Sequence, residues 1–285
     1  MHQVMLGDRV RLDAYDKALS EVVSPGATVA DVGAGTLPLT ALALRHGAAH
    51  VYAVEADPEL AAVADRIIEA TGWSERVTLV VGDARTVRLP RKVDVVVSEL
   101  MGNLGPEEDM GRLLRTFGRR NLNPGGATVP GRLVTHLAPI QFDDEGWGVW
   151  RDGFLDMRLS VVQQHTQAAA QLHFFHQMPT LLGEPGVLMD TAESDRTAQV
   201  LRLDIEQPGR LHAIVGYFNA TLAPGVTLSN FPSYPGCNWA VWVWPVRHTA
   251  VNPGDVVRVQ VRPPAGGRVV TDWRLDCQLL RHDAS

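Results

Sequence analysis

Two glycines follow a short apolar run near the N-terminus, in the segment Val-Ala-Asp-Val-Gly-Ala-Gly-Thr at residues 29–36. Glycine lets the backbone adopt left-handed turns and lets a ligand approach the main chain closely. Such a turn between a strand and a helix is typical of nucleotide sites, with Gly33 and Gly35 beside the ligand and Asp31 at the strand end. Dinucleotide-binding dehydrogenases are the rival interpretation, but their fingerprint needs a third glycine where this sequence has Pro38.

Two acidic residues follow later strands of the same predicted sheet. Glu55 comes twenty residues after Gly35, where a carboxylate can accept hydrogen bonds from both hydroxyls of a ribose. Asp83 lies in a Gly-Asp-Ala run after the third predicted strand, where its carboxylate and a backbone N–H can bind the edge of an adenine. The alternative for Asp83 is a turn or helix-cap residue. We favour the adenine contact because the residue follows the other parts of the site in order.

A further pair of carboxylates lies in Ser-Glu-Leu-Met-Gly-Asn-Leu-Gly-Pro-Glu-Glu, at residues 98–108. Glu99 ends a predicted strand beside the glycine turn, and Glu108 follows nine residues later. A carboxylate near a helix N-terminus is common because the helix dipole favours it, which is an ordinary explanation for Glu108. That explanation is weak for Glu99.

The elements that would position these residues have the pattern of a parallel sheet. Val-rich runs alternate with longer Ala- and Leu-rich segments, which predicts strands at 28–32, 50–55, 77–81 and 93–98 and helices at about 37–46 and 58–70. Helices are also predicted at 8–22 and 107–118. From residue 128, alternating runs between Pro and Gly turns predict antiparallel strands. We therefore place domains at 1–130 and 131–285, with a helix-compatible polar segment at 160–177 inside the second.

Composition limits the possible classes of protein. The chain has 285 residues, 45% of them hydrophobic and 20% charged, which is ordinary for a globular protein and excludes disordered and fibrous classes. A net charge of −6 disfavours a nucleic-acid surface. No run approaches the roughly 18 apolar residues of a membrane helix, and early charges disfavour a signal peptide. Cys237 and Cys277 lack zinc spacing, and His165, His173 and His176 lack a carboxylate-bearing motif. We expect a cytoplasmic protein without a metal.

The segment at 98–108 resembles the two-glutamate loop of the protein arginine methyltransferases. In that family Ser-Glu-Trp-Met-Gly is followed by a second glutamate nine residues after the first, and here Leu100 replaces the tryptophan. The resemblance covers nearly the whole chain. Its other parts are His2, Met5, Leu6, Asp8, Arg11 and Tyr15 near the N-terminus, and Trp150, Gly153, Phe154, Asp156, Tyr217 and Phe218 in the second half.

The resemblance implies a Rossmann-like methyltransferase domain followed by an antiparallel β-barrel domain, an α/β protein with a short helical dimerisation arm at about 160–180. It implies S-adenosylmethionine as cofactor, S-adenosylhomocysteine as product, and a homodimer. Glu99 and Glu108 would grip a guanidinium, whose planar, charged N–H pairs match carboxylates in a fork. Arg11 would bind the carboxylate of the cofactor. The expected cofactor-binding residues are His2, Arg11, Asp31, Gly33, Gly35, Thr36, Leu37, Glu55, Ala56, Asp83, Ala84 and Arg85.

The substrate side departs from the family pattern in one place. Met5 and Met110 match methionines that border the guanidinium pocket in members making mono- and asymmetric dimethylarginine. The family's Thr-His-Trp is Cys-Asn-Trp here, so that Asn238 precedes Trp239. The missing histidine pairs in the family with the aspartate equivalent to Asp8 and is proposed to handle the departing proton. Asparagine cannot titrate, so the proton would leave through a glutamate or water, or the acceptor would differ from a peptide arginine.

The resemblance also bears on the cofactor's surroundings. The family's helix that folds over the cofactor would lie before Met1, so we expect a more open cofactor or one covered by a partner.

Three functions remain at this point. The first is methyl transfer to a guanidino nitrogen, with free L-arginine or a small guanidino metabolite slightly favoured over protein arginine. The second is methyl transfer to a hydroxyl or amine of a secondary metabolite, for which paired glutamates have no use. The third is a non-catalytic scaffold that binds the cofactor, against which the retention of Glu99, Glu108, Arg11 and Glu55 argues.

Overall fold

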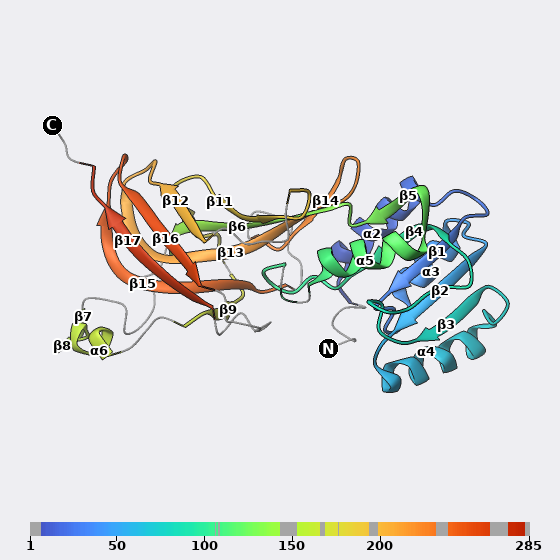
Figure 1. Cartoon of the computed structure of the whole chain (residues 1–285). Helices are drawn as coiled ribbons and strands as arrows, with labels where there is room; N and C mark the ends of the chain where they lie inside the picture. Colours follow the sequence, from blue (N-terminus) through green and yellow to red (C-terminus); the bar gives the residue numbers. More distant parts are fainter. Residues whose placement is uncertain are drawn as a thin grey trace.

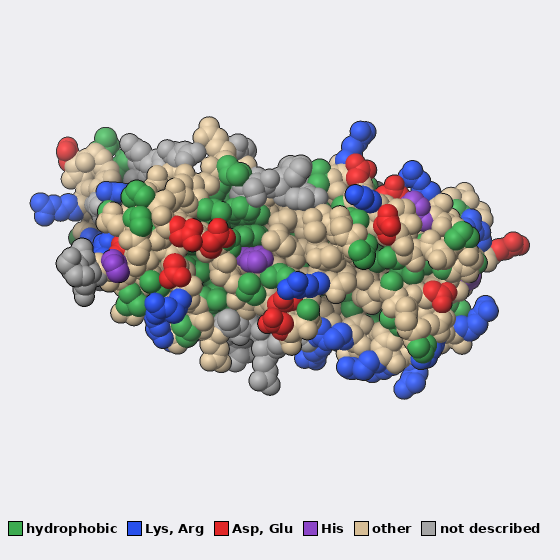
Figure 2. All heavy atoms as spheres, turned by 90° about the horizontal axis from the view of Figure 1, so that it is seen from above, with side chains coloured by type: hydrophobic (Ala, Val, Ile, Leu, Met, Phe, Trp, Pro, Cys, Tyr) green, Lys and Arg blue, Asp and Glu red, His purple; other side chains and the backbone are tan. Residues whose placement is uncertain are grey.

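The computed structural model of the protein describes residues 7–105, 107, 109–142, 153–165, 169–175, 177–193, 199–231, 239–262 and 273–282. The chain forms two units that lie end to end along the long axis of the molecule, with α5 (Met110–Asn121) near their junction (Figure 1). Acidic and basic side chains both occur on each half of the face shown in Figure 2.

The first unit is built on a parallel sheet of five strands in the order β3-β2-β1-β4-β5. Its strands are β1 (Thr28–Val32), β2 (His50–Glu55), β3 (Val77–Val81), β4 (Val93–Ser98) and β5 (Leu122–Val129). The first, second and fourth are buried along almost their whole length because helices cover both faces of the sheet. The four strands predicted from the Val-rich runs are confirmed at the same boundaries.

The helices of this unit are α2 (Arg9–Val22), α3 (Pro38–Arg45), α4 (Pro58–Thr71) and α5. Two of them begin with proline, which suits the first helical turn because the missing N–H would be unpaired there. The prediction for 107–118 is displaced, since α5 begins at Met110. Asp109, directly before it, has a left-handed φ of 56°, so the helix cannot extend back through that residue.

The second unit is antiparallel and barrel-like. Its strands are β6 (Arg132–Gln141), β9 (Gln171–His173), β10 (Thr180–Leu181), β11 (Gly186–Asp190), β12 (Val200–Asp204), β13 (Gly209–Ala223), β14 (Val226–Ser229), β15 (Val241–Val251), β16 (Val256–Arg262) and β17 (Arg274–Leu280). Seven of them form a sheet around the path β10-β6-β13-β15-β9, and β12-β16-β17 form a second sheet. Apolar side chains of both sheets, among them Leu137, Trp244 and Val259, share one core.

A small projection made of β7 (Gly153–Phe154), β8 (Met157–Arg158) and α6 (Ser160–His165) stands away from the second unit (Figure 1). The predicted helix at 160–177 is therefore wrong in length, since α6 ends at His165. Gln171–His173 forms β9 instead, because it pairs with β15 at Val241–Val243.

The two units share a hydrophobic core at their junction. Leu19 of α2 belongs to the same buried cluster as Phe218 of β13 and Leu228 of β14. Helix α2 thus joins the end of the parallel sheet to the barrel-like unit, and residues on both units can contribute to one site. Within the described residues, no helix is both long enough and apolar enough to cross a membrane.

Candidate functional site

The glycine turn brings the backbone of the first unit close to the glutamate segment. Gly33 has a φ of +77°, and a Cβ built on it would lie 2.8 Å from Cδ2 of Leu100. The N–H of Gly33 donates to the carbonyl of Val54 at 2.9 Å. Thr36 follows this turn, and Leu37, buried and with a φ of 69°, precedes α3. Any side chain at Gly33 would push Leu100 away from the turn.

Asp31 at the end of β1 is buried and only partly hydrogen-bonded. Its Oδ2 accepts a 2.7 Å bond from the hydroxyl of Thr40. Its Oδ1 has no hydrogen-bond partner among the described residues. Burial raises the pKa of Asp31 from 3.8 to about 6, more than the Thr40 bond lowers it. No cation in the described part of the chain pairs with this carboxylate to stabilise its charge.

Arg11 lies at the centre of a charged cluster. Its Nη1 donates to Oε2 of Glu99 at 2.9 Å, and its Nη2 lies 3.3 Å from Oδ2 of Asp8. Asp8 is also the N-cap of α2, because its carboxylate accepts the N–H of Arg11 at 3.1 Å. The guanidinium carbon lies 3.3 Å above the ring centre of Trp239, which is a cation–π contact. Arg11 is buried, and its Nε has no partner in the described part of the chain.

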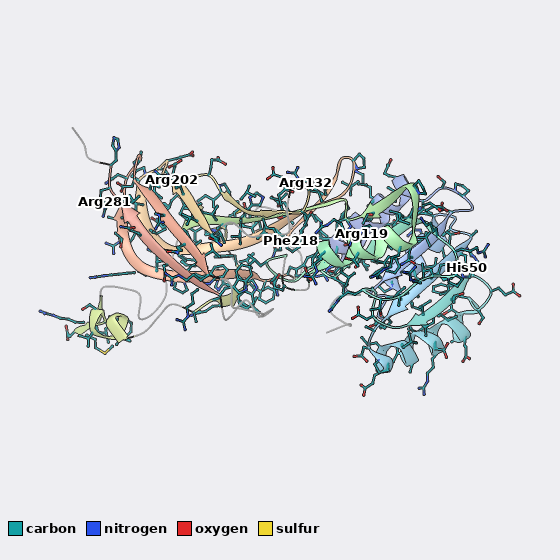
Figure 3. All side chains as sticks on the ribbon, in the orientation of Figure 1. His50, Arg119, Arg132, Arg202, Phe218 and Arg281 are labelled. Atoms are coloured by element: carbon teal, nitrogen blue, oxygen red, sulfur yellow. The ribbon has the colours of Figure 1, made fainter. Side chains whose placement is uncertain are left out.

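Helix α2 fixes the backbone next to Glu99 through Tyr15. The hydroxyl of Tyr15 donates to the carbonyl of Ser98 at 2.8 Å, and the hydroxyl of Ser98 donates to the carbonyl of Val32. Burial raises the pKa of Tyr15 well above its ordinary value, and Glu99 raises it further, so the phenol stays neutral. In the other unit, Phe218, which is labelled in Figure 3, packs edge-on against Trp239 with ring centres 5.1 Å apart.

Two cavities meet at Gly33. The smaller, of about 60 Å³, is lined by Arg11, Tyr15, Asp31, Gly35, Thr36 and Glu99, among others. The larger, of about 450 Å³, is lined by Glu55, Ala56, Asp83, Ala84 and Arg85, among others. The two cavities lie on opposite sides of the glycine turn. Most of the cofactor-binding residues expected from the sequence line one or the other of them.

Two carboxylates border the larger cavity. Oε2 of Glu55 accepts the N–H of Gly35 at 2.9 Å, and its Oε1 accepts the N–H of Asp57 at 2.9 Å. Each oxygen keeps lone pairs for a further donor. Asp83 is exposed, and it accepts the N–H of Arg85 at 2.8 Å, as a turn residue does. Both uses proposed for Asp83 therefore remain compatible with its position.

Some predicted site residues are not described by the structure or lie away from these two cavities. His2, Met5, Glu108 and Asn238 fall outside the described residues. Met110 is buried and lines neither cavity at Gly33. It lines a separate cleft of about 340 Å³ between α5 and the β5–β6 connection, with Leu114, Leu122 and Leu133. Within the described ranges, no group of three or more His, Cys, Asp or Glu side chains is arranged to hold a metal ion.

Two kinds of site residue were not predicted from the sequence. Thr40 could have been found, because it lies in the first turn of the helix that follows the glycine turn. Asn230 and Trp242 could not, because they reach the glutamate segment only through contacts between the two units.

The chain matches one family model and is similar to several known proteins. A model described as "Methyltransferase domain" matches residues 29–126. The chain is 30% identical over 282 residues to "Arginine N(omega)-methyltransferase" of Streptomyces achromogenes subsp. streptozoticus, covering 91% of this chain and 75% of that protein. It is 27% identical over 252 residues to "Protein arginine N-methyltransferase 1" of Oryza sativa subsp. indica, covering 85% of this chain and 65% of that protein.

Other similarities are shorter or rest on structure. The match to "Probable protein arginine N-methyltransferase 6" of Arabidopsis thaliana is 35% identical over 146 residues, which is 50% of this chain and 33% of that protein. The chain thus spans a third to two thirds of the length of these plant relatives. The solved Trypanosoma brucei PRMT1 enzyme-prozyme heterotetrameric complex with AdoHcy has the same fold, with a TM-score of 0.79, 20% identity, and coverage of 99% of this chain and 93% of that one.

Proposed function

Since the chain belongs to the protein arginine methyltransferase family, we propose that it is a cytoplasmic S-adenosylmethionine-dependent N-methyltransferase acting on a guanidino nitrogen. The observation that carries the proposal is the cluster of Arg11, Asp8 and Glu99 beside the unpaired oxygen of Asp31. We assign cofactor binding to residues 1–130 and place the acceptor between this unit and residues 131–285.

The smaller cavity suits the amino-acid end of the cofactor. An α-amino acid carries a carboxylate and an ammonium group, and the cavity offers the Nε of Arg11 and the Oδ1 of Asp31, two buried atoms that have no hydrogen-bond partner among the described residues. An ammonium beside Asp31 would stabilise the charged carboxylate, whose pKa burial raises. A carboxylate beside Arg11 would complete the charge-assisted bonds that its guanidinium can make.

The larger cavity suits the adenosine end. Each oxygen of Glu55 is oriented by one backbone N–H and keeps lone pairs for a ribose hydroxyl. Asp83 and the residues after it border the same cavity, where an adenine edge needs one acceptor and one donor. The bound cofactor supplies a methyl group on a positively charged sulfur.

The acceptor would meet Glu99 at the point where the two units join. Glu99 accepts a bond from the guanidinium of Arg11 at 2.9 Å, which supports the proposal that its carboxylate can bind such a group. With Glu108 as the second carboxylate, the acceptor would be gripped along its N–H edges, leaving one nitrogen for attack. With the cofactor bound, that nitrogen would bond to the methyl carbon while the bond from carbon to sulfur breaks. The excess proton would then pass to a glutamate or to water.

We favour free L-arginine or a small guanidino metabolite over protein arginine as acceptor. The Streptomyces relative, similar over most of both chains, is named for arginine itself. Asn238 in place of the family's histidine also fits an acceptor other than a peptide arginine.

We further propose a homodimer that uses the projection formed by β7, β8 and α6. Phe154, Leu155, Met157 and Val161 are exposed there at 48%, 87%, 55% and 57%. Exposed apolar side chains gathered on one projection mark a surface that binds another protein. Sedimentation at micromolar concentration is expected to show a dimer, and Leu155→Asp is expected to shift it toward monomer. A dimer that Leu155→Asp leaves intact would exclude this projection as the contact.

The function is tested by methyl transfer from labelled S-adenosylmethionine to free L-arginine and to an Arg-Gly-rich peptide, assayed side by side. We expect label on free arginine and loss of label with Glu99→Gln. Label on the peptide alone would make the protein a modifier of proteins. Label on neither acceptor, despite cofactor binding, would contradict the guanidino assignment.

A further inference from the structure

Glu107 lies directly before the second glutamate of the pair, and the structure gives its carboxylate a different task. Its Oε1 accepts the N–H of Leu104 at 2.7 Å, and its Oε2 accepts the N–H of Gly105 at 2.7 Å. Both donors lie in residues 99–105, which together with Glu107 we call the glutamate loop. Glu107 therefore binds the backbone of the loop that carries Glu99.

The third donor to Glu107 comes from the other unit. The indole Nε1 of Trp242, on β15, donates to Oε1 of Glu107 at 2.9 Å. With three N–H donors, most of the acceptor capacity of this carboxylate is occupied. Hydrogen bonds to a charged group in a low-dielectric surrounding are stronger than neutral ones, so this contact is well suited to fix the loop.

The space around Glu107 is adapted to this contact. A Cβ built on Gly102 would lie 2.5 Å from both Cδ and Oε2 of Glu107. The carboxylate thus occupies the place that any side chain at position 102 would fill.

Two further bonds hold the same loop against the barrel-like unit. The hydroxyl of Thr135, on β6, donates to the carbonyl of Leu104 at 3.0 Å. The amide nitrogen of Asn230, which follows β14, donates to the carbonyl of Asn103 at 2.6 Å and to that of Ala240 at 2.9 Å. Ala240 directly follows Trp239, so Asn230 also joins the loop to the residue that covers Arg11.

We infer that Glu107 is a positioning residue, through which Trp242 of the barrel-like unit sets the geometry of the glutamate loop and of Glu99. This inference rests on the proposed guanidino methyl transfer. It separates two adjacent carboxylates by role: Glu107 holds the loop, and Glu108 remains the candidate that grips the acceptor. Residues of the second unit then control acceptor turnover without touching the cofactor.

Trp242→Phe is the cleanest test, because it removes the indole donor, keeps an aromatic ring, and changes a residue that lines neither cavity at Gly33. The matched control is Trp244→Phe in the same strand. Its ring belongs to the same core cluster as Leu104 and Trp242, but its indole donates to the carbonyl of Trp273 at 3.3 Å instead of to Glu107. We expect Trp242→Phe to lower kcat/KM for the guanidino acceptor about tenfold. Trp244→Phe is expected to leave it within about twofold, and both are expected to keep cofactor affinity.

A double-mutant cycle with Glu107→Gln identifies the path. If Trp242 acts through Glu107, adding Trp242→Phe to Glu107→Gln lowers kcat/KM by less than about twofold more. Full additivity of the two effects would overturn the inference, since Trp242 would then act by another route. Equal effects of Trp242→Phe and Trp244→Phe on turnover would also overturn it.

Hydrogen exchange gives a readout that does not depend on activity. Amide exchange in the peptide covering residues 99–105 is expected to speed up about tenfold in Trp242→Phe and in Glu107→Gln, and to stay unchanged in Trp244→Phe. If the wild-type protein methylates no guanidino compound, the proposed function fails, while this exchange still decides whether Trp242 holds the loop. Unchanged exchange in Trp242→Phe would sink the positioning role even in an active enzyme.

Discussion

The two units of the chain hold their polar side chains at the site in different ways. In the parallel-sheet unit, Asp31 and Glu55 are bound by groups 9 and 20 residues away in sequence. The barrel-like unit reaches the glutamate loop through Asn230 and Trp242, which are 127 and 135 residues from their partners. The geometry of Asp31 and Glu55 is thus set locally in sequence, and that of the glutamate loop depends on how the units pack. Substitutions in the two regions should separate cofactor affinity from acceptor turnover.

The strongest test of this division is Glu99→Gln, because Glu99 belongs to the loop and still contacts Arg11. We expect kcat to fall about a thousandfold, since an amide cannot stabilise the positive charge of the acceptor as a carboxylate does. Cofactor affinity, measured by calorimetry, should change by less than about fivefold, because Asp8 still pairs with Arg11. Glu21→Gln, at an exposed site on α2, is the control for removal of a carboxylate. Parallel losses of turnover and affinity would remove the division.

The next effect concerns Asp31 and is a gain in stability. Burial raises the pKa of Asp31 to about 6, so the folded protein without cofactor is destabilised whenever this group is charged. Asp31→Asn should stabilise that form by roughly 3 kcal/mol at pH 8, given about 1.4 kcal/mol for each pKa unit. The gain should shrink as the pH falls below about 6 and vanish below 3.8, where the carboxyl is protonated both folded and unfolded.

Urea unfolding of Asp31→Asn at pH 8 and pH 5 measures this gain. The control is Asp65→Asn, at an exposed position on α4. The same variant should bind the cofactor more weakly, because the amide cannot pair with an ammonium group. A stability gain of equal size at both pH values would show that the buried charge is not its cause.

Arg11→Lys should weaken cofactor binding about thirtyfold, a loss typical of charge-assisted hydrogen bonds. A lysine ammonium keeps the charge, but it cannot replace the planar fork that reaches Glu99 and Asp8 together. Calorimetric titration with S-adenosylhomocysteine gives the affinity without turnover. Wild-type affinity in this variant would show that Arg11 serves the structure of the loop alone.

The smallest expected effect comes from Trp239 of the barrel-like unit, whose ring contacts Arg11. Trp239→Leu removes the cation–π contact at 3.3 Å and should weaken cofactor binding about fivefold. Trp242→Phe, from the same unit, should leave cofactor affinity unchanged. If both variants weaken cofactor binding equally, the barrel-like unit supports the cofactor site as a whole. The proposed separation between cofactor affinity and acceptor turnover would then be contradicted.

The sequence predicted the parallel sheet well and the barrel-like unit less well. Strands buried on both faces need unbroken valine runs, and such runs mark their own ends, as at Thr28–Val32 and Val93–Ser98. Helix α6 was predicted too long because a polar segment can be helix or strand, and pairing of Gln171–His173 with β15 decides between them. Boundaries set by one residue's backbone, such as Asp109 before α5, leave little trace in a pattern of side chains.

The candidate site was likewise predicted well in the parallel-sheet unit and less well where the two units meet. Asp31, Gly33, Gly35 and Glu55 were predicted to lie together, because strand ends of one parallel sheet meet at one edge, and they do line adjoining cavities. The cation–π stacking of Trp239 on Arg11 and the bond from Trp242 to Glu107 join residues that are far apart in sequence. No single-sequence pattern predicts such pairs, because they arise only when the two units pack together.

The unpaired oxygen of Asp31 has a practical consequence for handling the protein. A preparation stripped of its cofactor holds this carboxylate in the interior with no counter-ion among the residues that the structure describes, and alkaline buffer keeps it ionised. A ligand that binds only the folded form stabilises that form in proportion to its occupancy. Storage at mildly acidic pH, or with S-adenosylhomocysteine added to every chromatography buffer, should therefore prolong the life of the purified protein and favour its crystallisation.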